Sequence, residues 1–339
     1  MTVRMKDIAR DLGVSVVTVS KVLRNHGDIS KETRQRVLKR MKELNYRPNL
    51  AARALITGKS YTIGLIVPDL LHPFFAQVAK ALSGVFRKHG YSLILSSSEE
   101  DPELEKEELD VLLTRRVDAL LIASAQWTVE SFRQIEDQQI PYVLIDRRFV
   151  GLAANFVGVD DETAGALATA HLIEQGCRRI AHIRGPEVST AIGRAEGYRR
   201  TLAENAMPSL PGYVISIGGS GDERGEVGGY DAAKALLATE PRPDGIFCYN
   251  DPTAMGVMRA ILEAGLRIPE DIAVVGCGNV IYSDLLRVPL TTVDQNSLSI
   301  GAQAAELALS LMDAKAPPRP VSICIEPTLI VRASSLKRT

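Results

Sequence analysis

The stretch MKDIARDLGVSVVTVSKVL, residues 5–23, decides how the N-terminal part of the chain folds. Its first apolar residues recur at the spacing of one helical face, at Met5, Ile8, Ala9 and Leu12. Gly13 then supplies a turn, and Ser15 can cap a second helix that buries residues 19, 22 and 23. Two short helices joined by a glycine-containing turn form a helix-turn-helix unit.

The second helix of such a unit enters the DNA major groove through its N-terminal residues. The side chains that would face the groove are Val16, Val17, Thr18, Ser20 and Lys21. Lys21 can donate to guanine O6 and N7, and the valines can contact thymine methyl groups. Past this helix, we expect contacts to the DNA backbone from Asn25, His26 and Arg34.

A third helix, capped by Ser30, presents an apolar stripe of Val37, Met41 and Leu44. It would complete a three-helix core. The alternative is a generic helical bundle without a DNA surface. The apolar pair at 16 and 17 argues against a bundle, since it stands exposed beside Thr18, Ser20 and Lys21.

Charge divides the chain at the same place. Residues 1–60 hold 14 lysines and arginines against 5 aspartates and glutamates, whereas the remainder holds 26 against 36. A basic module on an acidic body indicates that the module meets a polyanion. By itself the charge also fits a solvated basic surface, so the helical pattern decides the interpretation.

The stretch NYRPNLAARALITGK, residues 45–59, joins the two parts. Pro48 ends the preceding helix, Asn49 can cap a new one, and Gly58 can end it in the left-handed conformation. That leaves about two turns, and isolated helices below roughly 12 residues are marginal in water. We expect this segment to be helical only when something packs against it.

From residue 61 onward, short apolar runs alternate with helical stretches, which predicts parallel sheets covered on both faces. One series of strands is expected at 62–68, 91–98, 119–124, 142–146 and 156–160. A second is expected at 178–185, 214–219, 245–250 and 273–278, with 291–295 as a possible crossing between two lobes.

The quoted stretch from Met5, continued by ETRQRVLKRMKELNYRPNLAARAL, resembles the head and hinge of the LacI/GalR family of bacterial repressors. The resemblance runs unbroken over residues 3–58 and extends to the body. It implies a small all-α helix-turn-helix head and an α/β two-lobed body like that of periplasmic binding proteins. It also implies that paired hinge helices enter the minor groove, with Leu55 as a wedge beside Ala52 and Arg53. Plain linker packing is the alternative for Leu55.

The expected boundaries follow from this resemblance. A DNA-binding domain covers 1–48 and a hinge covers 49–60. An effector-binding and dimerisation domain covers 61–339. Within it, the N-lobe is expected at about 61–161 and 296–318, and the C-lobe at about 162–290 and 319–339.

Ligands of open α/β sheets bind beyond the carboxyl ends of the strands, so the effector site can be nominated from the residues that follow each strand. These candidates are Asp69, Phe74, Phe75, Trp127, Asp146, Arg147, Arg194, Tyr249, Asn250, Asp251, Asn279 and Gln295. Such a mixture of carboxylates, amides and aromatic rings suits a sugar or sugar derivative. Trp127 fits a core position equally well, and Asp69 fits a solvated loop.

The family resemblance singles out Asp146, Arg194 and the pair Asn250 and Asp251 as effector contacts. At one place the sequence departs from the pattern of the family. Many relatives have an aromatic residue and then an aspartate after the strand at 273–278, whereas this chain reads Gly276, Cys277, Gly278, Asn279. Asn279 could replace the missing carboxylate, or the effector could lack the group that the carboxylate binds.

The sequence shows no nucleophile elbow, P-loop, dinucleotide fingerprint or zinc-protease motif, so we expect no enzymatic activity. Scattered histidines and four distant cysteines indicate no metal, cofactor or disulfide framework. No apolar run is long enough to span a membrane, and we expect a cytoplasmic protein. The rival interpretation, a sugar-binding receptor without DNA function, should lack the basic head.

The combined hypothesis is a transcriptional regulator, in the manner of a repressor. Its homodimer would read a pseudo-palindromic double-stranded operator. A small carbohydrate in the cleft, either inducer or corepressor, would shift the hinge helices between folded and unfolded states.

Overall fold

The computed structural model describes residues 3–23, 26–46, 54, 57–126, 129–149, 151–217, 225–316 and 318–337. Contacts divide the chain into two units, Met1–Ser60 and Tyr61–Thr339, called here the head and the body. The roles predicted for Asn25, Ala52, Arg53, Leu55 and Trp127 fall outside the described residues.

Three helices build the head: α1 (Met5–Leu12), α2 (Val16–Leu23) and α3 (Lys31–Glu43). Gly13 lies between the first two with a left-handed φ of 64°. The hydroxyl of Ser15 accepts from the Thr18 amide at 3.0 Å, and Ser30 caps the third helix. Their buried core is formed by Ile8, Ala9, Val19, Val22, Val37 and Met41. The predicted helix-turn-helix and its third helix are therefore present.

The body contains two six-stranded sheets, one in each lobe. The first has the order β11-β5-β4-β3-β1-β2, and its neighbouring strands are parallel. Its strands are β1 (Thr62–Val67), β2 (Ser92–Ser97), β3 (Ala119–Ile122), β4 (Tyr142–Ile145), β5 (Phe156–Val159) and β11 (Ser322–Ile325).

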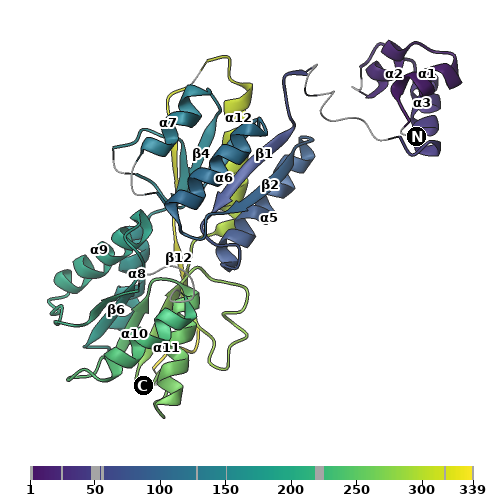
Figure 1. The fold of residues 1–339 in the computed structure, drawn as a ribbon. Coiled ribbons are helices and arrows are strands. Elements are labelled where there is room, and N and C mark those ends of the chain that lie inside the picture. The colour runs from purple at the N-terminus through teal and green to yellow at the C-terminus, as the bar shows by residue number, and fades with distance from the viewer. Residues whose placement is uncertain are drawn as a thin grey trace. The chain divides into compact units, whose positions relative to one another are not determined.

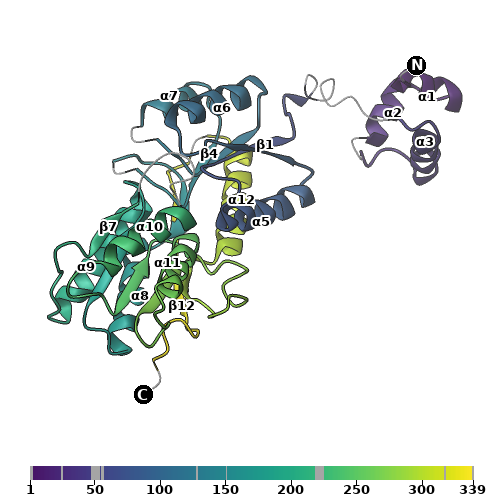
Figure 2. The same ribbon diagram turned by 60° about the horizontal axis from the view of Figure 1, so that its bottom comes forward.

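Helices cover both faces of this sheet (Figure 1). They are α5 (Pro73–Lys88), α6 (Pro102–Thr114), α7 (Glu130–Asp137) and α12 (Ser297–Asp313). On one face, α5 and α12 lie side by side and bury Leu82 and Ala304 in a common core (Figures 1 and 2). On the other face, α6 and α7 contribute Leu112 and Phe132 to a second core.

The second sheet has the order β12-β10-β9-β8-β6-β7, and only β12 runs antiparallel to its described neighbour. Its strands are β6 (Ile180–Arg184), β7 (Val214–Ser216), β8 (Gly245–Cys248), β9 (Ala273–Cys277), β10 (Thr291–Asp294) and β12 (Thr328–Ile330). Its helices are α8 (Asp161–Glu174), α9 (Ser189–Glu204), α10 (Glu226–Leu237) and α11 (Asp251–Glu263). They pack in pairs, α8 with α9 on one face and α10 with α11 on the other.

The chain passes between the lobes after β5, after β10 and again between β11 and β12. The last passage corrects one expectation. We assigned 319–339 to the C-lobe, but β11 pairs in parallel with β5 of the first sheet, with Ile323 opposite Val157. The strand is four residues long with only alternate residues half-buried, so its sequence carries little apolar signal.

Close helix contacts in the second lobe depend on glycine. A Cβ atom on Gly197 of α9 would lie 2.0 Å from the carbonyl oxygen of Glu162 in α8. A Cβ atom on Gly256 of α11 would lie 1.9 Å from the carbonyl oxygen of Glu226 in α10. Backbone atoms cannot yield to such a contact without separating the helices. The close packing of α8 against α9, and of α10 against α11, therefore requires glycine at these two positions.

We expect Gly197→Ala to lower the free energy of unfolding by about 1–3 kcal/mol, because the added methyl group overpacks a backbone contact. The matched control is Gly84→Ala on α5, where an added Cβ meets nothing within 4 Å. That change should leave stability unchanged or raise it by up to about 1 kcal/mol, because alanine favours helix. Urea denaturation of both variants measures the difference, and equal effects would show that the close contact is unimportant.

Candidate functional site

The predicted reading surface of the head lies at the start of α2. Val16 and Val17 are 43% and 61% exposed, although they follow directly on a capped helix start. Beneath them, Val19 and Val22 are buried against α1 and α3. The Thr18 hydroxyl is hydrogen-bonded to that of Ser15 at 2.9 Å. The buried Val19 and Val22 thus anchor α2 in the head and leave the two apolar side chains at its start on the surface.

Two basic residues predicted to contact DNA have partners within the head. Lys21 forms an ion pair with Asp28, and this hydrogen bond lowers the pKa of the Asp28 carboxyl. Arg34 donates to the carbonyl oxygen of His26 at 2.5 Å. The predicted contact of Lys21 with a DNA base would require this surface ion pair to break. Such exposed pairs are worth little, so its loss is inexpensive.

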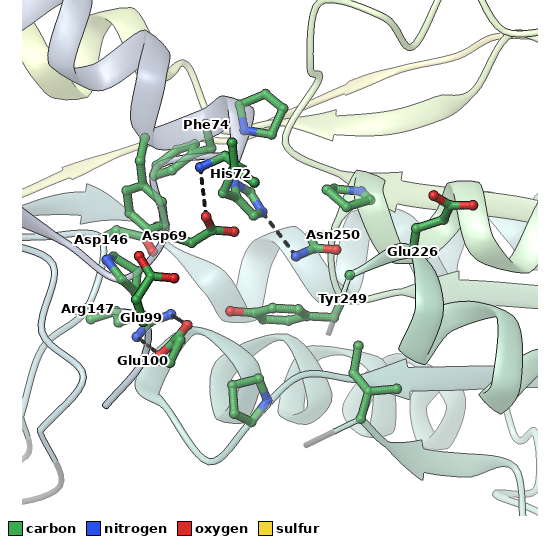
Figure 3. A pocket seen from close by; sticks show the side chains of 18 of the residues that line it. Asp69, His72, Phe74, Glu99, Glu100, Asp146, Arg147, Glu226, Tyr249 and Asn250 are labelled. Atoms are coloured by element: carbon green, nitrogen blue, oxygen red, sulfur yellow. Dashed lines mark hydrogen bonds and ion pairs between the residues drawn. The ribbon is translucent and has the colours of Figure 1, made fainter. Parts of the chain in front are cut away.

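A cleft of about 690 Å³ in the body is lined by segments that follow β1, β2, β4, β6, β7, β8 and β10. Figure 3 shows Asp69, His72 and Phe74 on one side of it, and Tyr249, Asn250 and Glu226 on the other. Among the sequence-predicted residues, the cleft brings together Asp69, Phe74, Phe75, Asp146, Arg147, Arg194, Tyr249, Asn250 and Gln295. Sheet polarity, which collects the carboxyl ends of the strands, explains why the sequence could identify them.

Aromatic rings form walls on both sides of the cleft. Phe74 and Phe75 sit at the start of α5, with ring centroids 5.1 Å apart in an edge-to-face arrangement. Tyr249 follows β8 in the other lobe, and its hydroxyl lies 3.1 Å from that of Thr190. Gly185 makes room for this ring, since a Cβ atom there would approach it to 2.6 Å.

Arg194, on α9, is 3% exposed and fixed from two sides. Its Nε donates to Asp161 at 2.9 Å, and its Nη1 donates to the carbonyl oxygen of Tyr249 at 2.7 Å. Asp161 begins α8 directly after the first passage between the lobes. Burial raises the pKa of the Asp161 carboxyl to about 7, and the direct ion pair with Arg194 opposes part of this rise.

Asp146 follows β4 with a left-handed φ of 63°, an unusual conformation for a residue with a side chain. Its Oδ1 accepts from Gln295, at the second passage between the lobes, at 3.3 Å. Burial raises the pKa of the Asp146 carboxyl, while Arg194 and Arg147 lower it. The strained backbone aims a carboxylate into the cleft beside Arg194.

His72 and Asn250 are hydrogen-bonded across the cleft at 3.1 Å (Figure 3). The Oδ1 atom of Asn250 accepts from the Thr253 amide, which turns the NH2 group toward His72. The Nε2 atom of His72 must therefore accept, and its proton lies on Nδ1, which is buried without a partner in the described residues. Burial and the charges of Arg147 and Arg194 lower the pKa of His72 to about 4, so the ring is neutral at pH 7.

Acidic residues that follow β2 and begin α10 also line the cleft and are not among the residues predicted from the sequence. These are Glu99, Glu100 and Glu226. Glu100 holds Arg147 in a two-pronged ion pair, at 2.7 Å to Nη1 and 2.5 Å to Nη2. The signal was available, because the SSSEED run at 96–101 follows a predicted strand just as the other candidate segments do.

Two expected effector residues lie outside the cleft lining. Asp251 is fully buried, and its carboxylate accepts from Val280, Ser283 and Thr292. Asn279 uses both ends of its amide, toward Asp294 and Arg332. Neither residue is among those that line the cleft, and their polar atoms connect segments of the second lobe.

In the part of the chain that the structure describes, no helix is long and apolar enough to cross a membrane. The same described residues contain no group of three or more histidine, cysteine, aspartate or glutamate side chains that could hold a metal ion.

We expect Asp251→Ala to lower the free energy of unfolding by about 2–4 kcal/mol, because it leaves three buried donors without an acceptor. Asp284→Ala removes an exposed carboxylate from the same region and should change stability by less than about 0.5 kcal/mol. Chemical denaturation followed by circular dichroism compares them. Equal stability of the two variants would contradict a structural role for Asp251.

Comparison with known proteins agrees with both units. Residues 4–49 match the family of bacterial regulatory proteins, lacI family, and residues 169–335 match a periplasmic binding protein-like domain. The ribose operon repressor of Halalkalibacterium halodurans is 36% identical over 312 residues, covering 92% of this chain and 91% of that protein.

Solved structures are similar over nearly the whole chain. The lac repressor dimer bound to operator and the anti-inducer ONPF is 27% identical, with a TM-score of 0.86, covering 99% of this chain and all of the other. The regulator CelR in complex with cellobiose is 28% identical, with a TM-score of 0.73, covering 98% and 99%. The identity to the ribose operon repressor, the helix-turn-helix head and the two-lobed body together show that this chain belongs to the LacI family of bacterial transcriptional regulators.

Proposed function

We propose that the cleft binds a small carbohydrate and that this binding controls the affinity of the head for a pseudo-palindromic DNA operator. The observation that carries the proposal is the composition of the cleft. Phe74 and Tyr249 offer apolar faces from opposite lobes, and buried Asp146, Arg194 and Gln295 offer hydrogen-bonding groups between them. Sugars present the same combination, with hydroxyl groups around a C–H surface.

The relatives support a carbohydrate. One is named for the ribose operon, and one solved relative holds cellobiose. The name of the first gives the operon that it represses, and the second is a complex with a disaccharide. For this chain we take the shared class, a sugar, as the proposed effector.

We also propose that the working form is a homodimer, as in the lac repressor dimer. The body exposes an apolar segment after β9, where Ile281, Tyr282 and Leu285 are 62%, 48% and 78% exposed. Contiguous exposed apolar residues of this kind mark interaction surfaces. A two-fold dimer would place two heads on the two halves of one operator.

The proposed coupling rests on the three passages between the lobes. A ligand that contacts both walls favours one relative orientation of the lobes, and it can shift the equilibrium only by its differential affinity for the two orientations. Such couplings are typically about 1–3 kcal/mol. The hinge would convert that difference into a change of DNA affinity, because a short helix is stable only when packed.

The experiment is a thermal-shift screen of pentoses, hexoses and disaccharides, followed by fluorescence anisotropy with an operator selected from random duplex DNA. We expect one sugar to raise the melting temperature, since a ligand of the native state stabilises by RT ln(1 + [L]/Kd). It should also change operator affinity about 5- to 150-fold. Asp146→Ala should remove both effects, while the exposed control Asp110→Ala should retain them. A sugar that binds without changing DNA affinity would contradict the proposed coupling.

For the head, we expect Lys21→Ala to relax base preference at one position of each half-site and to weaken operator binding by about 1–3 kcal/mol. The matched control is Lys42→Ala, an exposed lysine near the end of α3 and outside the proposed reading helix. Selection of random duplexes with each variant measures the preference. An unchanged selected sequence for Lys21→Ala would remove this residue from the base readers.

A further inference from the structure

The two arginines of the cleft are already neutralised by the protein. Arg147 gives both terminal nitrogens to the carboxylate of Glu100, and Nη1 also contacts the carbonyl oxygen of Ser124 at 3.1 Å. The two side chains are 6% and 14% exposed, so water screens this pair weakly. Bidentate pairing of this kind uses the guanidinium N–H groups that would otherwise bind a phosphate or carboxylate of the ligand.

Arg194 is compensated in the same way by a different partner. Its Nε is paired with Asp161 and its Nη1 with a backbone carbonyl, while Nη2 has no hydrogen-bond partner among the described residues. One donor suffices for a hydroxyl group. An anion would need an uncompensated charge, and the neighbouring carboxylate of Asp161 removes it.

The other ionisable residues of the described lining are acidic. Besides Glu100, the lining includes Asp69, Glu99, Asp146 and Glu226, while His72 is neutral at pH 7. Glu226 lies 3.3 Å from Arg259, and Asp69 accepts from the Leu71 amide. Asp146 lies near Arg194 and Arg147 but forms no direct ion pair with a described residue, and its hydrogen bond comes from Gln295. The lining described by the structure therefore carries net negative charge.

We propose that this cleft selects an effector without negative charge, a neutral sugar as opposed to a sugar phosphate or sugar acid, and that Glu100 is the residue that sets this selectivity. The inference rests on the proposed carbohydrate effector and narrows it. Glu100 acts by occupying Arg147, which an anionic ligand would otherwise pair with. It is a specificity residue because its replacement changes which charge the cleft accepts.

The physical basis is the low effective dielectric of a partly closed cleft. Charges a few ångströms apart interact there several times more strongly than in water. An incoming phosphate loses its hydration and meets Asp146, while both nearby arginines are already paired with carboxylates. A neutral sugar loses less hydration energy than a phosphate, and its hydroxyls can donate to Asp146 and accept from Arg194, forming charge-assisted hydrogen bonds.

The first test uses wild-type protein and matched probes: D-ribose with D-ribose 5-phosphate, and D-glucose with D-glucose 6-phosphate. Thermal shift and isothermal titration calorimetry are performed at pH 7.5 and fixed ionic strength. We expect at least one parent sugar to bind at least about 10-fold more tightly than its phosphate ester, as uncompensated charge repulsion requires. An ester that binds as tightly as its parent, or more tightly, would overturn the charge inference and leave the carbohydrate proposal standing. If no probe binds and the wider sugar screen is also negative, the carbohydrate proposal fails and this inference fails with it.

The second test is Glu100→Gln, which keeps the shape of the side chain and releases the charge of Arg147. We expect the ratio of ester to parent affinity to rise at least about 10-fold in this variant, because an anion can now replace the lost carboxylate. The control is Glu103→Gln on α6, which removes the same charge from a side chain that is 77% exposed. An unchanged ratio in folded Glu100→Gln would show that Glu100 does not set selectivity. If circular dichroism shows that this variant is unfolded, the wild-type affinity ratio alone decides the charge inference.

Discussion

The ion pair between Arg194 and Asp161 is the interaction on which the rest of the body depends. It joins α9 to the beginning of α8, directly beyond the first passage between the lobes, and it also fixes the backbone at Tyr249. Three segments that are distant in sequence therefore meet at one guanidinium. A buried pair of this kind is costly to desolvate, so its value lies more in fixing a unique arrangement than in added stability. The positions of α8, α9 and Tyr249 around Arg194 in turn determine the shape of this side of the cleft.

Much of the fold was predictable because buried parallel strands leave a simple signal. The runs TIGLIV and AVVGC are uninterrupted apolar stretches, and both form strands at the expected places. The edge strand β11 was not recognised as part of the first sheet. Its sequence SICI is short and half exposed, and its partner β5 lies more than 160 residues earlier. A long-range pairing of that kind leaves no local pattern.

The cleft shows where residue-by-residue reasoning succeeds and where it stops. Position after a strand identified Asp146 and Asn250 correctly as lining residues, because sheet polarity determines that placement. The same rule failed for Asp251, one residue later, because the first turn of α11 directs its side chain into the protein. The sequence could also not show that Glu100 pairs with Arg147, 47 residues away. The sequence shows which residues follow a strand, but it does not show which side chains will form hydrogen bonds or ion pairs with each other in the folded chain.

The interleaving of the two lobes has a consequence for how the protein is made. The first lobe needs α12 to cover one face of its sheet and β11 to complete the edge beside β5. Both follow the greater part of the second lobe in the chain. During translation the head can fold as soon as it emerges, but the first sheet keeps one face only partly covered, by α5, and the edge at β5 open until α12 and β11 have been synthesised. Nascent chains of this topology are exposed to aggregation until these segments emerge, so the synthesis of α12 and β11 is the step that completes the first sheet.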